Sequence, residues 1–283
     1  MLSKLIKHEW KRFWKVPAGV CAFLILYTLI GSITFYTPLW DSSYGVVRLI
    51  LILGSISYIF VLMAPLVVLY VFIGYRFYQN FYTDEGYLMH TLPVTKNQLI
   101  LSKTIVAFIW SLIAALVTGL SIFLLILMIS TSARYGQLTF GEFFGDLYHS
   151  MKLIIPEFEQ ILGVPFWLFT LICIVLFLIS CLYSVLLIFG CMSVGHLWKK
   201  HPVAGGILAY VGMNILMQIL SLILVAGNIT RFLPYADQEA GFEAAYRSYM
   251  FSTLADGAIV NLIGIVLFYF ITHLILSRKL NLN

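Results

Sequence analysis

Few side chains in this sequence could do chemistry, and they stand far apart. The long apolar runs contain one carboxylate, Asp256, and one imidazole, His273. These two residues are 17 positions apart, about 25 Å along a helix, which is too far for a general acid–base pair. The sequence has no HExxH metal motif and no GxxxxGK[ST] phosphate-binding loop. The chain therefore offers neither a catalytic signature nor a nucleotide site of its own.

The thiols give no chemical site either. Three of the four cysteines lie inside apolar runs, the fourth lies at the edge of one, and their spacing does not suit a metal: Cys21, Cys173, Cys181 and Cys191. We interpret them as buried, inert thiols that pack as small apolar side chains.

Milder polar groups are grouped on one face of an apolar run. Asn214, Gln218 and Ser221 recur at i, i+4 and i+7, and Asn261 lies in the last run. Such residues hold membrane helices together through interhelical hydrogen bonds, or they line the path of a substrate. The sequence leaves both interpretations open.

The composition shows what must position these residues. Hydrophobic residues make up 61% of the 283 residues and charged residues 10%, against about 25% charged in soluble domains. Six apolar runs have the roughly 20 residues that a membrane-crossing helix needs: 18–37, 49–75, 104–130, 164–190, 204–227 and 255–276. We expect an all-α membrane protein with a short helix at 1–17 and a single six-span domain at 18–283.

The distribution of basic residues predicts the orientation of the spans. With both termini in the cytoplasm, 12 of the 17 Lys and Arg residues lie inside and five lie outside. Basic residues in short loops set membrane topology, so this asymmetry favours an N-in and C-in arrangement.

The first residues predict an amphipathic helix on the inner membrane surface. Leu5, Ile6, Trp10 and Phe13 recur at helical spacing, and lysines occupy another face. The apolar side chains would enter the acyl boundary while the lysines contact anionic headgroups. Pro17 would end this helix. The helix would serve as a plain anchor on the inner surface, or as an elbow that also touches a cytoplasmic partner.

The longest cytoplasmic segment between spans, 76–103, predicts a short projecting helix. Asp84 or the preceding threonine can cap it, and Glu85 suits the positive end of its dipole. Tyr87, Leu88 and Leu92 would share one apolar face before Pro93 ends the helix. A connector does not need this exposed apolar surface, which indicates a docking element.

Two outer loops also carry helical patterns. Thr139 and Glu142 form a capping box that precedes a helix of about 15 residues on the outer surface. Its apolar stripe comprises Phe140, Phe143, Phe144, Leu147, Met151, Ile154 and Ile155. In the loop 228–254, an apolar face from Phe242 to Met250 predicts a surface-lying or re-entrant helix.

A family resemblance rests on the segment between the second and third spans. The stretch DEGYLMHTLPV at 84–94, followed by Ser102-Lys103, resembles the corresponding loop of ABC-2 type transporter permeases of Gram-positive bacteria. The opening MLSKLIKHEWK and the six spans are similar to that family as well.

The resemblance implies a type V ABC exporter fold in the bacterial cytoplasmic membrane. It assigns docking on a separate ATPase to a coupling helix comprising Asp84, Glu85, Gly86, Tyr87, Leu88, Met89, Leu92 and Pro93. ATP and Mg²⁺ would bind two copies of that ATPase and no cofactor would bind this chain. A second permease half, identical or a sister, would complete the transporter, and no nucleic acid is involved.

The sparse charge in the spans favours an amphipathic or hydrophobic cargo, such as a peptide, an antimicrobial or a lipid-like molecule. Two alternatives to an exporter permease are an ATP-independent membrane protein, either a sensor or an assembly factor, and an intramembrane enzyme.

Overall fold

The structure is a computed structural model that describes residues 2–36, 44–83, 86, 94–131, 139–198, 200–235 and 241–278. These residues are helical nearly throughout, as the apolar runs predicted. The helices are α1 (Leu2–Phe13), α2 (Lys15–Tyr36), α3 (Gly45–Tyr82), α5 (Lys96–Ser130), α6 (Phe140–Leu162), α7 (Phe166–His196), α8 (Pro202–Phe232) and α9 (Phe242–Arg278), with a 3-10 turn η2 (Leu233–Tyr235).

Six of these helices are long and apolar enough to cross a membrane. The candidate spans are Lys15–Ser32, Gly45–Tyr82, Lys96–Ser130, Phe166–His196, Pro202–Tyr235 and Phe242–Ser277. Each corresponds to one predicted run, and five of the six are longer than the run. The 38 residues of α3 extend about 57 Å, well beyond a hydrocarbon core of about 30 Å.

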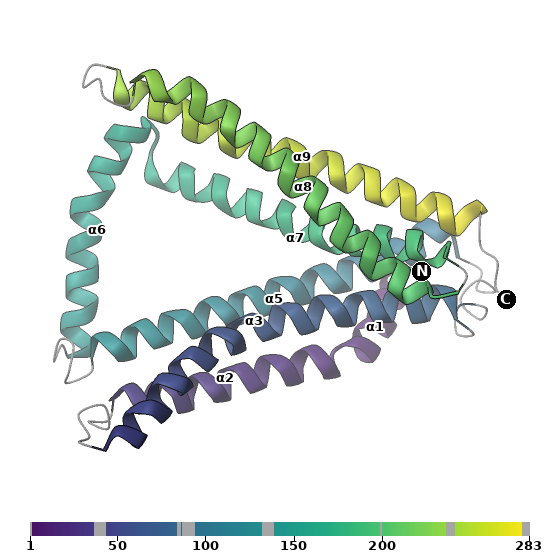
Figure 1. The fold of residues 1–283 in the computed structure, drawn as a ribbon, viewed down its shortest axis with the longest axis horizontal. Helices are drawn as coiled ribbons and strands as arrows, with labels where there is room; N and C mark the ends of the chain where they lie inside the picture. Colours follow the sequence, from purple (N-terminus) through teal and green to yellow (C-terminus); the bar gives the residue numbers. More distant parts are fainter. Residues whose placement is uncertain are drawn as a thin grey trace. The chain divides into compact units, whose positions relative to one another are not determined.

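The residues form two compact units. The first comprises Met1–Ile6, Ile73–Phe108 and Ile154–Asn283, and the second comprises Lys7–Phe72 and Ile109–Leu153. In the first unit, α7 packs against both α8 and α9, and α8 packs against α9 (Figure 1). In the second unit, hydroxyl groups join three helices: Tyr27 bonds Ser57 at 2.6 Å, and Tyr58 donates to the Ser121 carbonyl at 3.3 Å.

The N-terminal helix ends earlier than predicted. Helix α1 ends at Phe13, a turn at Trp14 follows, and α2 begins at Lys15. Pro17 therefore does not end the amphipathic helix but lies in the first turn of α2. A proline is tolerated there because the first N–H groups of a helix have no intrahelical partner.

Helix α6 confirms the capping box and is longer than predicted, at 23 residues. The Thr139 N–H donates to Glu142 Oε2 at 2.7 Å, and the Glu142 N–H donates to Thr139 Oγ1 at 3.3 Å. The backbone and hydroxyl donors of Thr139 lower the pKa of the exposed Glu142 carboxyl. The helix continues through Pro156 to Leu162.

The prediction for the loop 228–254 is wrong in one respect. Helix α8 continues to Phe232, and α9 already begins at Phe242, so this region is not a separate surface-lying or re-entrant helix. The apolar face that the sequence revealed packs instead on the end of α8. Phe232 contacts the rings of Phe242, Tyr246 and Tyr249, with centroids 5.6–6.2 Å apart.

Candidate functional site

The structure describes where the predicted docking segment leaves α3. Of its eight named residues, only Gly86 is among the described residues. The others lie outside them: Asp84, Glu85, Tyr87, Leu88, Met89, Leu92 and Pro93. The Gly86 N–H donates to the Thr83 carbonyl at 2.7 Å. A Cβ at Gly86 would lie 2.6 Å from the carbonyl oxygen of Phe81, so only glycine fits this close approach.

Packed aromatic rings join the last turns of α3, which precede this segment in the sequence, to α7. We call them the root cluster, defined as Phe77, Phe81, Tyr82, Phe189 and His196. Phe77 stacks on Phe189 with centroids 4.1 Å apart, and Tyr82 stacks on His196 at 4.3 Å. Phe77 and Phe81 are each 1% exposed. Stacked, buried rings add specific contacts to their apolar burial, so the end of α3 is tightly packed on α7.

Two lysines of α5, the helix that follows the segment in the sequence, bind other helices of the first unit. Lys103 in α5 is buried, and its Nζ lies 5.2 Å from the centroid of the Phe81 ring. Lys96, in the first turn of α5, donates to the Leu276 carbonyl near the end of α9 at 2.9 Å. A cation is favourable at a helix C-terminus, so this bond ties the start of α5 to α9. The end of α3 before the segment and the start of α5 after it are thus linked to each other and to α7 and α9.

The amphipathic face of α1 packs on other helices more than the sequence suggested. Trp10 stacks on Trp110 with centroids 5.2 Å apart, and Phe13 lies 4.8 Å from Phe72. Leu5 and Ile6 are half-buried. Trp10 and Phe13 therefore contact other helices, which holds α1 against α3 and α5. The lysines on the other face are exposed, as expected.

The four polar residues of the late spans do not come together. Asn261 in α9 donates to Ser180 Oγ in α7 at 2.9 Å, an interhelical bond of the kind predicted. Asn214 instead donates to the carbonyl of Tyr210 in its own helix at 2.8 Å. Gln218 and Ser221 are exposed on α8. These positions therefore give one interhelical contact and no shared polar face between helices.

A polar cluster that the sequence did not reveal joins α8 to α9. Asn228 is buried and donates to Asp256 Oδ2 at 2.9 Å and to Thr253 Oγ1 at 3.3 Å. In the sequence, Asp256 stands out only as an isolated acid, and Asn228 belongs to no motif considered above. Their positions in the sequence could have indicated the contact. Asn228 lies near the end of one span and Asp256 near the start of the next, so antiparallel packing of the two helices can bring the side chains together.

The junction between α6 and α7 is also fixed by polar contacts. Gly163 has φ +66°, a left-handed conformation that suits a glycine after a helix end. The Phe166 N–H at the start of α7 donates to Glu159 Oε1 at 2.7 Å. Arg247 of α9 donates to the carbonyls of Gln160 and Ile161 at 3.3–3.4 Å, so a cation caps the end of α6.

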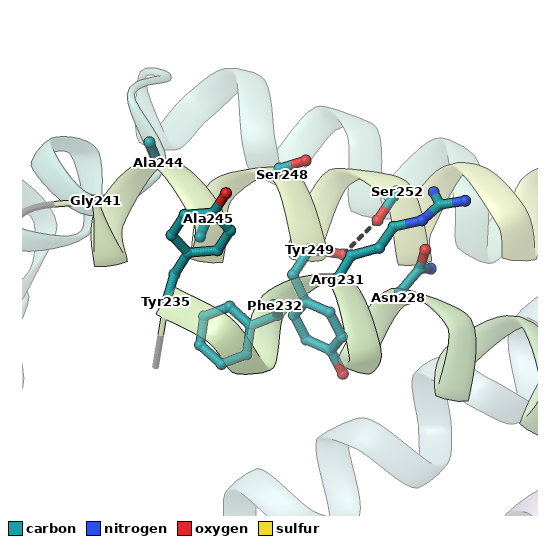
Figure 2. A pocket seen from close by; sticks show the side chains of 10 residues that line it. All are labelled: Asn228, Arg231, Phe232, Tyr235, Gly241, Ala244, Ala245, Ser248, Tyr249 and Ser252. Atoms are coloured by element: carbon teal, nitrogen blue, oxygen red, sulfur yellow. Dashed lines mark hydrogen bonds between the residues drawn. The ribbon is translucent and has the colours of Figure 1, made fainter. Parts of the chain in front are cut away.

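A cavity of about 380 Å³ lies at the turn between α8 and α9 (Figure 2). Its described lining combines one guanidinium, one amide, hydroxyl groups and aromatic rings: Asn228, Arg231, Phe232, Tyr235, Gly241, Ala244, Ala245, Ser248, Tyr249 and Ser252.

Within the described ranges, no three His, Cys, Asp or Glu side chains are grouped to hold a metal ion. The four cysteines are free thiols. Comparison with known proteins does not assign a family, because no family model, curated protein or solved structure matches the chain.

Proposed function

We propose that the chain is the permease subunit of an ATP-driven exporter in a bacterial cytoplasmic membrane. The single observation that carries the proposal is the DEGYLMHTLPV stretch between the candidate spans Gly45–Tyr82 and Lys96–Ser130. The excess of basic residues on the side that holds this segment and both termini supports a cytoplasmic position for it.

The packing of the helix ends that flank the segment supports its role as a mechanical connection. A partner that pushes on residues 84–93 acts on α3 through Phe81 and Gly86, and on α5 through Lys96. The root cluster passes that displacement to α7, because Phe77 and Phe189 are stacked and buried. Interfaces packed this closely move as units rather than deforming continuously.

The remaining parts of the transporter are supplied by partners. Two ATPase subunits bind ATP and Mg²⁺, and closure of the ATPase pair shifts the two permease halves. The second half is another copy of this chain or a sister chain. The cargo is an amphipathic or hydrophobic molecule, because the spans offer it few charged groups.

The test is co-purification of the ATPase with wild type and with Leu88→Asp. Apolar anchors at the centre of an interface are each worth about 2 kcal/mol or more, so the charge should lower ATPase retention about 30-fold. Glu85→Ala should act more mildly, since an acid near a helix start contributes about 0.3–1 kcal/mol.

Leu147→Asp is the matched control, because Leu147 is an exposed leucine on α6, away from the docking segment in sequence. It should retain the ATPase and its substrate-stimulated turnover. Full retention of both by Leu88→Asp would remove the main support for a transporter.

A further inference from the structure

The apolar stripe of α6 has no role in the exporter proposal. Five of its members are 41–60% exposed: Phe140, Phe144, Leu147, Met151 and Ile154. With 3.6 residues per turn, these five side chains fall within one arc of the helix. The charged residues of α6 all fall outside that arc: Glu142, Asp146, Lys152, Glu157 and Glu159. A helix of this pattern binds through its apolar arc and keeps its charged arc in water.

Both ends of α6 adjoin candidate membrane spans in the sequence. The span Lys96–Ser130 precedes it, and the span Phe166–His196 follows it. Consecutive spans cross a membrane in opposite directions, so the end of the first and the start of the second reach the same boundary. The charged residues of α6 keep it out of the hydrocarbon core, so the helix stays at that boundary.

The last turns of α6 show which surface continues the stripe. Phe158 lies about five turns after Phe140 and therefore on the same arc. Its ring contacts those of Phe166 and Phe169 in α7, with centroids 5.7 and 5.0 Å apart. Trp167, beside this contact, is 66% exposed, and tryptophan is enriched where a span meets the membrane surface. The stripe is thus continuous with the start of a candidate span.

The charge of α6 differs from that of the other amphipathic helix. Helix α1 carries four basic residues and one acidic residue, a pattern that anionic headgroups attract. Helix α6 carries four carboxylates and Lys152, while Arg134 precedes it in the sequence and Arg247 binds the carbonyls at its end. Acidic residues at least balance the basic residues here. Burial of the apolar stripe must therefore supply the attraction to a membrane.

We propose that the apolar stripe of α6 is buried in the acyl boundary of the membrane leaflet that receives the end of α5 and the start of α7. Its occupant is the acyl chains of lipid, which bind it by apolar contact whatever the charge of their headgroups. Continuity with the start of α7 favours lipid over a second copy of the chain, because the exposed Trp167 lies at the same boundary. Bound in this way, α6 holds two span ends at one depth. This binding requires the candidate spans but not transport.

The test measures the depth of nitroxides on the full chain in phosphatidylcholine bilayers, from their collisions with oxygen and with a water-soluble nickel chelate. Alanine replaces the native cysteines, and Leu147→Cys or Met151→Cys carries the label in the stripe. Oxygen collisions should dominate at both positions. The ratio of the two collision rates should place both labels about 5–10 Å into the boundary between headgroups and acyl chains.

Gly145→Cys is the matched control, because Gly145 is exposed on the same stretch of α6 but outside the stripe, and an added Cβ there has nothing within 4 Å. Its nitroxide should collide mainly with the nickel chelate and lie about 10 Å nearer to water, since a helix with its side chains is about 10–12 Å wide. Helical content and a single elution peak confirm that each labelled variant is folded. Two stripe positions keep the test valid if one label disturbs the helix.

The role of headgroup charge is tested by adding phosphatidylglycerol to the bilayer and by raising the salt concentration. The depth at positions 147 and 151 should be the same in every condition. Insertion that requires phosphatidylglycerol, or that salt reverses, would overturn the proposal, because headgroup charge rather than apolar burial would then hold the helix.

The collision rates also separate lipid from the other possible occupants. Nickel collisions at positions 147 and 151 as frequent as those at 145 would show that the stripe faces water. Low collision rates with both reagents would show that protein covers the stripe, and dipolar broadening between labels would identify that protein as a second copy. Either result would overturn the assignment of lipid to the stripe.

Discussion

Two apolar helical regions of this molecule meet opposite surroundings. In the second half of α7, Val185, Phe189 and Ser193 are at most 2% exposed, and the helices of the first unit cover them. In α6, Phe140, Phe144 and Ile154 are 49–60% exposed, and α6 packs on described residues mainly at its last turns. The apolar surface of α7 is buried within the chain, and the apolar stripe of α6 is exposed.

The difference separates a rigid region from a surface that needs an external partner. The buried half of α7 packs on Phe77 of α3, the helix that precedes residues 84–93 in the sequence. Under the proposed function, a force from the ATPase would enter at those residues. The exposed stripe of α6 belongs to an amphipathic helix with a capped start, which is typical of a helix lying in a membrane interface. The following predictions test this contrast from its largest expected effect to its smallest.

Phe189→Ala should be the most damaging change, because it removes a ring stacked on Phe77 in the root cluster. Truncating a buried phenylalanine costs about 3–5 kcal/mol in soluble cores. We expect the lower end of that range, because helices in lipid gain van der Waals packing from association but no transfer of apolar surface out of water. Thermal unfolding in detergent measures the loss. Phe144→Ala on α6 is the control and should change the unfolding temperature little; equal losses would erase the contrast.

Gly195→Ala should destabilise the contact between α7 and α8. A Cβ there would overlap the backbone of Gly206, which cannot move aside as a flexible side chain can. We expect a loss of about 1–3 kcal/mol from overpacking, again read from thermal unfolding. Gly212→Ala has nothing within 4 Å of its added Cβ and should be neutral or gain up to about 1 kcal/mol of helix propensity. A neutral Gly195→Ala would show that this contact is loose.

The start of α6 should respond weakly to acid. The folded state lowers the pKa of Glu142, so its cap stabilises α6 above the ordinary glutamate pKa and is lost as pH falls through the lowered value. A nitroxide at the exposed position Gly141 should become more mobile in that acid range. Glu142→Gln should remove the pH dependence. Mobility that is independent of pH in wild type would indicate that the capping box does not hold the helix in lipid.

The sequence predicted the helices far better than their contacts. Apolar runs locate the six candidate spans because lipid imposes length and composition on any crossing helix. The capping box located the start of α6 to the residue, since a cap depends on neighbours in sequence. The extension of α9 back to Phe242 was missed because its first turns are polar on one side, and only the ring of Phe232 shows which face is covered.

Contacts between distant residues could not be predicted in the same way. Periodicity shows which face of its own helix a residue occupies, but it does not show that Asn228 and Asp256 face each other. The same holds for Arg247 and the carbonyls at the end of α6. Asn261 was chosen for its type, and its partner Ser180 became visible only in the fold. The docking residues remain a prediction from motif and composition, because apart from Gly86 they lie outside the described residues.

The most direct test of the central claim is photo-crosslinking from position 88 in native membranes. A photoreactive amino acid replaces Leu88, a second variant carries it at Phe144 on α6, and mass spectrometry identifies the captured protein. The account predicts a crosslink from position 88 to an ATP-hydrolysing subunit, weakened when nucleotide changes the state of the ATPase, and no such crosslink from position 144. Capture of lipid alone from position 88, or of the same ATPase from both positions, would contradict the assignment of residues 84–93 as the docking element.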